Sequence, residues 1–204
     1  MPLRSRYQKA PSDRINFSFL DYATGTTTAQ IYPCMADNAG TYDHFLLATA
    51  IDSDPAYLEA TGNTGSDTKV TDEDYDFLVA NTVTLQGKAI VSFTHWAYAF
   101  NNATCHAKIR IRHWDGTTET EVASQDSPDI TAVGGTNQER IAISITLPKT
   151  TYKKGDYIRM TVELWIDSDA ATTYRFYNDP NSNDTVGGLD TDAVLLLPML
   201  SAVV

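Results

Sequence analysis

The sequence KAIVSFTHWAYAFNNATCHAKIRIRHW, residues 88–114, decides the expected fold. Its apolar side chains alternate with polar ones, which is the two-residue period of a β-strand, since a helix repeats every 3.6 residues. The alternation runs over 88–100 and again over 103–114. Asparagine tolerates the positive φ that a two-residue turn needs. The sequence therefore predicts an antiparallel hairpin that turns at Asn101 and Asn102.

The register of this hairpin divides its side chains between two faces. The predicted turn places Tyr98 opposite Cys105. The side chains expected in the core are Trp96, Tyr98, Phe100, Cys105, Ala107, Ile109 and Ile111. Those expected on the opposite face are His106, Lys108, Arg110 and Arg112. We therefore expect one buried apolar face and one basic, exposed face.

Further strands are expected along the chain, separated by turn residues such as glycine, aspartate and proline. They are Thr28–Tyr32, Asn81–Gln86, Thr118–Ser124, Ile141–Leu147, Tyr157–Asp167, Thr172–Tyr177 and Ala193–Pro198. One short helical segment could form at 72–80, where Thr71 can serve as N-cap before acidic residues. About eight short strands at this spacing predict an all-β fold, an antiparallel β-sandwich of the jelly-roll type.

Length and charge bear on domain organisation and on partners. The 204 residues predict one domain over 17–204, after a basic arm over 1–16. The cations of this arm are Arg4, Arg6, Lys9 and Arg14. The net charge of −11 opposes binding to nucleic acid and to an anionic membrane surface. We find no apolar run of membrane-spanning length and no secretory signal, so we expect a protein made and kept in a cytoplasm.

No spacing in the sequence matches a catalytic or metal-binding motif. It contains no GxSxG elbow for a serine nucleophile. Cys105 and His106 are neighbours on a strand and therefore face opposite sides. The four histidines lie apart, and the paired loop carboxylates favour solvated acids over a Ca²⁺ site. We therefore expect no enzyme, no metal and no cofactor.

Three segments in the carboxyl-terminal third carry a family resemblance: Leu147–Trp165, Tyr174–Pro180 and Asp192–Pro198. Together they resemble jelly-roll proteins encoded near the major capsid gene of tailed bacterial viruses, especially decoration or auxiliary head proteins. The resemblance implies a structural protein of the virion without catalysis, assembled in the host cytoplasm as a homotrimer. Its implied partner is the major capsid protein, whose outer surface the basic arm would contact.

The carboxyl-terminal strand is apolar on both faces, and such a surface is costly to leave in water. We expect it to be buried against a neighbouring subunit or against the body of the same domain. The candidate subunit contacts are Leu195, Leu197, Met199 and Leu200.

Two alternatives remain open beside the capsid-surface role. One is a carbohydrate-binding β-sandwich module, and the other is a binding protein associated with a phage tail or fibre. Trp114 and Trp165 lie on the polar faces of their strands. Each could offer its ring to a sugar or a partner protein, or be covered by a neighbouring segment.

Overall fold

The computed structural model describes residues 26–38, 41–48, 57–62, 65–178, 185–186, 189–190 and 192–200. Every regular element in these ranges is a β-strand, so the predicted all-β class is confirmed. Within the same ranges no helix has the length and apolar character to cross a membrane. The predicted arm, with Arg4, Arg6, Lys9 and Arg14, lies outside the described residues.

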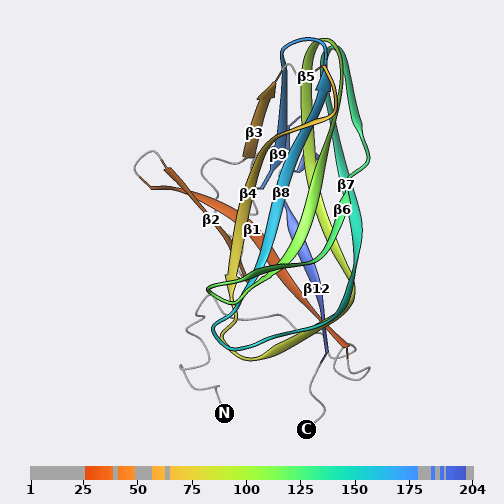
Figure 1. The fold of residues 1–204 in the computed structure, drawn as a ribbon. Helices are drawn as coiled ribbons and strands as arrows, with labels where there is room; N and C mark the ends of the chain where they lie inside the picture. The colour runs from red at the N-terminus through yellow and green to blue at the C-terminus, as the bar shows by residue number, and fades with distance from the viewer. Residues whose placement is uncertain are drawn as a thin grey trace, which may run out of the picture.

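The described strands follow one another in chain order (Figure 1). They are β1 (Thr26–Asn38), β2 (Thr41–Leu47), β3 (Tyr57–Gly62), β4 (Thr68–Leu78), β5 (Val83–Trp114), β6 (Glu119–Asp126), β7 (Ile130–Tyr152), β8 (Tyr157–Ser168), β9 (Thr172–Tyr177), β10 (Thr185–Val186), β11 (Leu189–Asp190) and β12 (Val194–Leu200).

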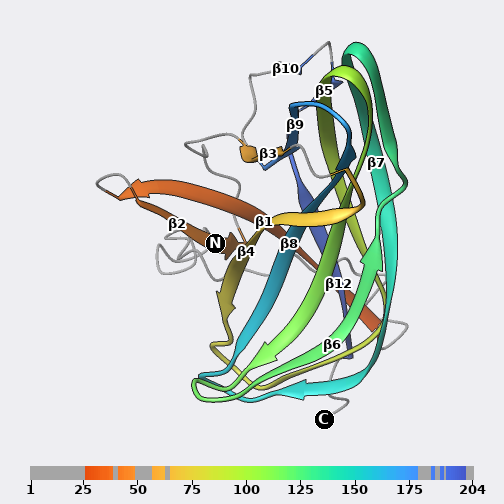
Figure 2. The same cartoon turned by 45° about the horizontal axis from the view of Figure 1, so that its top comes forward.

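The longest strand, β5, covers 32 residues and bends over at its middle, so that its two ends lie at the same end of the molecule (Figures 1 and 2). It pairs with β7 on both sides of the expected turn, with Ala99 opposite Gly135 and Asn102 opposite Val133. Two residues of β5 therefore lie opposite Gly134 alone, which makes a β-bulge, and Gly134 takes a φ of 59° there. The predicted hairpin is wrong, because the bulge absorbs the extra residue and the strand continues.

Because its two halves form one continuous strand, the odd-numbered side chains of β5 face the core on both sides of the bulge, where Asn101 is exposed. Phe93, His95 and Ala97 are buried in the first half, and Ile109 and Ile111 are buried in the second. The prediction of a buried face is thus confirmed for the second half of the stretch.

The predicted core is wrong for the first half of β5. A hairpin would have brought even-numbered residues before the turn onto the same face as odd-numbered residues after it. In the continuous strand Trp96 and Tyr98 are half-buried, and Phe100 is 67% exposed. These three aromatic side chains therefore belong to the outer face.

Three strands share the other edge of β5. β12 pairs with its first part, β9 with the segment 95–99 and β8 with the segment 103–114. Figure 1 shows β5 and β7 bending together over the top of the molecule, with β8 rising from the lower end to the same top end. Figure 2 shows the same long curve of β7 along β5 from another side. β5 is therefore the element around which the others are placed.

The pairings close into a ring of six strands: β12, β1, β2, β4, β8 and β5. Each contributes to one hydrophobic core, for example through Ile31, Leu46, Tyr75, Ile109, Met160 and Leu195. The pairing of β2 with β4 is parallel, at Phe45 and Asp76. The prediction of a wholly antiparallel arrangement is wrong at this point.

A helical turn was expected over 72–80, but residues 72–78 of this segment form part of β4 instead. β4 pairs with β8 from Thr68, opposite Ile166, to Leu78, opposite Tyr157. A helix this short has little stability of its own, whereas the strand gains a full ladder of backbone hydrogen bonds.

The apolar strand β12 lies between β1 and β5. Leu195 and Leu197 are fully buried, Met199 is 9% exposed and Leu200 is half-buried. Burial against the body of the same chain, one of the two expected outcomes, is what the structure shows for this strand. Leu195 and Leu197 have no surface left for a partner, and a subunit contact through Leu200 stays a prediction.

Replacing Ile109 with alanine should lower the free energy of unfolding by roughly 2 to 5 kcal/mol, because a fully buried side chain leaves a cavity. The matched control is Ile90→Ala on the same strand, where the side chain is 39% exposed. Urea denaturation measures both changes. Equal losses for the two variants would contradict the assignment of the faces of β5.

The core beneath β5 also contains a buried imidazole. Nδ1 of His95 lies 3.0 Å from the hydroxyl of Tyr174. Burial lowers the pKa of His95 to about 4, because the charged form is poorly solvated there. A histidine in an unfolded chain titrates near pH 6.5, so between these values the unfolded state binds more protons.

We therefore expect stability to fall as the pH drops from about 6.5 towards 4, by on the order of 3 kcal/mol through His95. His95→Asn keeps a polar group near Tyr174 and removes the titration. Its unfolding free energy should depend less on pH between these two values. Burial also lowers the pKa of His44, and the resulting pH dependence is the same in both proteins. Identical pH profiles would show that His95 is solvated.

Candidate functional site

The outer side of β5 carries two chemically different regions. We call the first the aromatic face, which consists of Tyr57, Trp96, Tyr98, Phe100 and Arg175. We call the second the charge ladder, which consists of Arg110, Arg112 and Arg159 with the carboxylates that pair with them. Both regions follow from the continuity of β5, since its even-numbered side chains share one side from Trp96 to Arg112.

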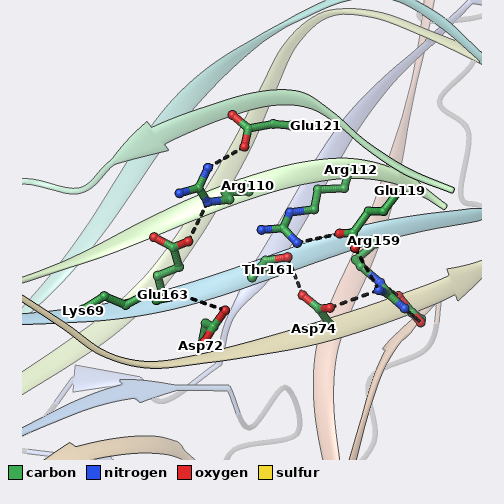
Figure 3. Close-up of polar contacts among 11 residues, drawn as sticks. Lys69, Asp72, Asp74, Arg110, Arg112, Glu119, Glu121, Arg159, Thr161 and Glu163 are labelled. Atoms are coloured by element: carbon green, nitrogen blue, oxygen red, sulfur yellow. Dashed lines mark hydrogen bonds and ion pairs between the residues drawn. The ribbon is translucent and has the colours of Figure 1, made fainter.

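The charge ladder begins at Arg110, which lies between β8 and β6 (Figure 3). Its Nε donates to Oε1 of Glu163 at 2.6 Å, and its Nη1 donates to Glu121 at 2.5 Å. The side chain of Glu163 is only 3% exposed, and its Oε2 accepts a hydrogen bond from Nε1 of Trp165 at 3.0 Å. These bonds satisfy both oxygens of a buried carboxylate.

A second cluster of the ladder surrounds Arg159. Its guanidinium donates two hydrogen bonds of 2.7 Å to Asp76, and its Nη1 lies 3.1 Å from Asp74. Arg112 lies directly opposite Arg159 in the β5–β8 pairing, and Glu119 lies within 2.5 Å of Arg112 and 3.5 Å of Arg159. The carboxylate of Glu119 therefore separates two like charges.

The prediction that this face of the strand is basic and exposed is wrong. His106, Lys108, Arg110 and Arg112 do point outwards, but they are half-buried and each lies next to an acidic side chain. Cross-strand carboxylates raise the pKa values of Arg110 and Arg159, which reflects how closely these charges are matched. We interpret the ladder as a feature that stabilises the sheet.

The two tryptophans that the sequence placed on outer faces are covered by neighbours. The guanidinium carbon of Arg159 lies 5.3 Å from the ring centre of Trp114. His106 stacks on Trp165, with ring centroids 5.7 Å apart and planes within 12°. A charged or aromatic side chain therefore lies against each indole, and neither belongs to a row of rings that ends in an exposed one.

The aromatic face is built from residues that the sequence assigned to the core. Trp96, Tyr98 and Phe100 follow one another at two-residue intervals on the outer side of β5. The rings of Trp96 and Tyr98 are nearly parallel, at 14°, with centroids 6.3 Å apart. Tyr98 meets Phe100 edge to face at 5.4 Å. The result is a row of rings along the strand.

Arg175 extends this row across β9 to β3. It pairs with Trp96 in one direction and with Glu59 in the other. Its guanidinium carbon lies 4.2 Å from the ring centre of Tyr57 and 4.7 Å from that of Trp96. Nε of Arg175 donates to Glu59 at 2.7 Å. The guanidinium thus bridges two rings and is neutralised by one carboxylate.

Neutral polar side chains border the aromatic face. Gln138 of β7 lies opposite Trp96, and Tyr98 has Thr136 of β7 on one side and Thr173 of β9 on the other. Rings with hydroxyl and amide groups at their edges suit a ligand that is apolar on its faces and polar at its rim.

The remaining titratable clusters offer no metal site within the described ranges, where no group of three suitable side chains occurs. His113 and Asp156 are in contact, with Nε2 2.6 Å from Oδ2. The backbone N–H of Lys153, and then His113, lower the pKa of Asp156. Asp156 therefore fixes the turn before β8. Cys34 and Cys105 are both buried and reduced.

No protein-family model and no curated protein matches the sequence. Solved structures do match its fold. A CocE/NonD family hydrolase from Staphylococcus aureus has a TM-score of 0.50 at 12% identity, over 85% of this chain and 37% of that chain. An aminopeptidase from a marine sediment Thaumarchaeota archaeon has a TM-score of 0.53 at 9% identity, over 84% and 37%. An α-amino acid ester hydrolase has a TM-score of 0.54 at 10% identity, over 83% and 36%.

These comparisons correct the expectation that the chain is not an enzyme, because the solved structures that share its fold are hydrolases and a peptidase. The chain spans little more than one third of each, and identities of 9–12% show a common fold alone. None of the three is described as a viral protein. The decoration-protein role, the homotrimer and the capsid partner stay predictions.

Replacing Glu163 with alanine should lower the free energy of unfolding by roughly 3 kcal/mol, because it leaves Arg110 and the indole N–H without a buried acceptor. Glu121→Ala removes the exposed partner of the same arginine and should cost less than about 1 kcal/mol. Chemical denaturation of both variants tests this difference. A larger loss for Glu121 would contradict our account of the ladder.

Proposed function

We propose that this chain is a carbohydrate-binding domain that holds a glycan on its aromatic face. The observation that supports this proposal is the row formed by Trp96, Tyr98 and Phe100 on the outer side of β5. A sugar ring has an apolar face of C–H groups and a rim of hydroxyls. It can stack on such rings while its hydroxyls bond to the polar groups beside them.

Two exposed apolar side chains at the end of the row support a ligand-binding role. Phe100 is 67% exposed, and Val133, which lies nearby across the bulge, is 70% exposed. Exposed apolar side chains grouped at one end of a sheet are unfavourable in water and are typical of binding surfaces. A ligand that covers them gains the free energy of removing this area from solvent.

The charge distribution favours a sugar over a nucleic acid. A nucleic acid would need cations beside the stacking rings to neutralise its phosphates. The guanidinium of Arg175 is paired with Glu59, and the whole chain has a net charge of −11. Stacking is available on the aromatic face, but the accompanying positive potential is not.

We also propose that the fold is of the jelly-roll type. The length of β5 supports this description, because one strand provides an edge to β12, to β9 and to β8 in turn. A strand that long can take part in two layers as the sheet curls over its own core. In this description the aromatic face and the charge ladder are the two ends of one outer surface.

Trp96→Ala should weaken glycan binding by about tenfold, or ~1.4 kcal/mol, because it removes the ring between Tyr98 and Arg175. The ligand is first identified by a glycan screen, and its affinity is then measured by isothermal titration calorimetry. Trp114→Ala, at the far end of the same strand, should leave the affinity unchanged. Equal binding by wild type and Trp96→Ala would refute the placement of the site.

A further inference from the structure

We infer that Glu59 sets the charge class of the ligand: by pairing with Arg175, it makes the aromatic face select neutral glycans over anionic ones. This inference rests on the proposed glycan-binding function and adds to it the class of glycan and the residue that determines it. Arg175 is held among the rings of the aromatic face.

The guanidinium of Arg175 is well placed to meet an anion. The rings of Tyr57 and Trp96 lie 4.2 and 4.7 Å from its central carbon, which fixes the plane of the group. A planar guanidinium held in this way is the group that proteins use for two-pronged recognition of carboxylates and phosphates. An acidic sugar bound along the row of rings would therefore bring its carboxylate towards Arg175.

In the structure, the side chain of Glu59 provides the carboxylate that binds Arg175. Its Oε2 accepts the Nε–H of Arg175 at 2.7 Å, and the two residues are direct partners in the β3–β9 ladder. The side chain of Glu59 is 40% exposed, so its charge also faces an approaching ligand. A carboxylate on the ligand would have to displace Glu59 or lie beside it, and both are unfavourable.

The surroundings reinforce the exclusion of anions. Arg140 on the neighbouring strand β7 is paired with Asp192 at 2.7 Å. The polar side chains nearest the rings, Gln138, Thr136 and Thr173, are uncharged. The net charge of −11 adds a repulsive potential for polyanions at low salt. The aromatic face thus offers stacking and neutral hydrogen bonds, without positive charge in excess.

The test is the variant Glu59→Gln, which keeps the size of the side chain and an oxygen that can accept the Nε–H of Arg175. The probes are soluble neutral glycans (a β-glucan, a xylan and a mannan) and the anionic polygalacturonate, each titrated by calorimetry at low and at high salt. We expect the wild type to bind a neutral glycan and to bind polygalacturonate at least tenfold more weakly. Glu59→Gln should gain at least tenfold in affinity for polygalacturonate, and salt should weaken this gain.

Two controls separate the local effect from net charge. Glu121→Gln changes the charge of the whole protein by the same amount within the charge ladder, and it should give no gain. The double variant Glu59→Gln with Arg175→Gln removes the guanidinium and should lose the gain. A rise in polygalacturonate affinity of the same size in Glu121→Gln would overturn the inference.

The remaining outcomes distinguish this inference from the function on which it rests. If the wild type binds a neutral glycan and Glu59→Gln gains nothing for polygalacturonate, the role of Glu59 is refuted while glycan binding stands. Comparable binding of both glycan classes by the wild type also refutes it. If wild type and variant bind none of the probes, the proposed function and the inference both fail.

Discussion

The pairing of β5 with β7 is the constraint on which the rest of the structure depends. It keeps β5 a single strand through the bend and bulge at 99–102, so that β5 offers a second edge to three partners. β12, β9 and β8 each pair with a part of that edge, and β1, β3 and β4 are placed in turn by these three. A hairpin at the asparagines would pair the two halves of β5 with each other, so that this edge would no longer be free for β8 and β9.

The same continuity determines what the outer surface presents. Side chains alternate strictly along a strand, so every even-numbered position of β5 after Thr94 stays on one side. The aromatic residues near Trp96 and the cations near Arg110 therefore lie on the same face of a sheet that curls over with β5. Their neighbours differ: β9 and β3 bring Arg175 and Glu59 to the rings, whereas β8, β6 and β4 bring carboxylates to the cations.

Positive and negative side chains are closely paired on this face of the sheet. The pattern of pairing distinguishes side chains with a structural role from those with a functional role. In the charge ladder every described guanidinium has at least one carboxylate within hydrogen-bonding distance, and Glu163 is shielded from water. Such groups are held in place by one another and contribute mainly to the sheet. The aromatic face has a single ion pair among several rings, which leaves stacking as its main interaction. The fold that this chain shares with hydrolases describes only how the chain packs. The proposal about its ligand comes from the aromatic face.

The sequence by itself determined the strand class and the second half of the core. Alternation at 105–111 and at 158–166 is unambiguous, because apolar side chains at every second position have only one way to reach a core. Strand β9 was predicted with the bounds that the structure shows. Local patterns of this kind need no knowledge of distant residues.

Only the tertiary structure decided the first half of β5, and with it the candidate site. The local sequence allows two placements for Trp96: inside with a turn at the asparagines, or outside with a bulge. Alanines at 97, 99, 103 and 107, all on the inner side, were the one local sign of continuity. The choice was made by β7, whose Gly134 permits the bulge and which pairs with β5 on both sides of it. Long-range strand pairing also placed Glu59 beside Arg175, because residues more than a hundred positions apart meet only when β3 joins β9.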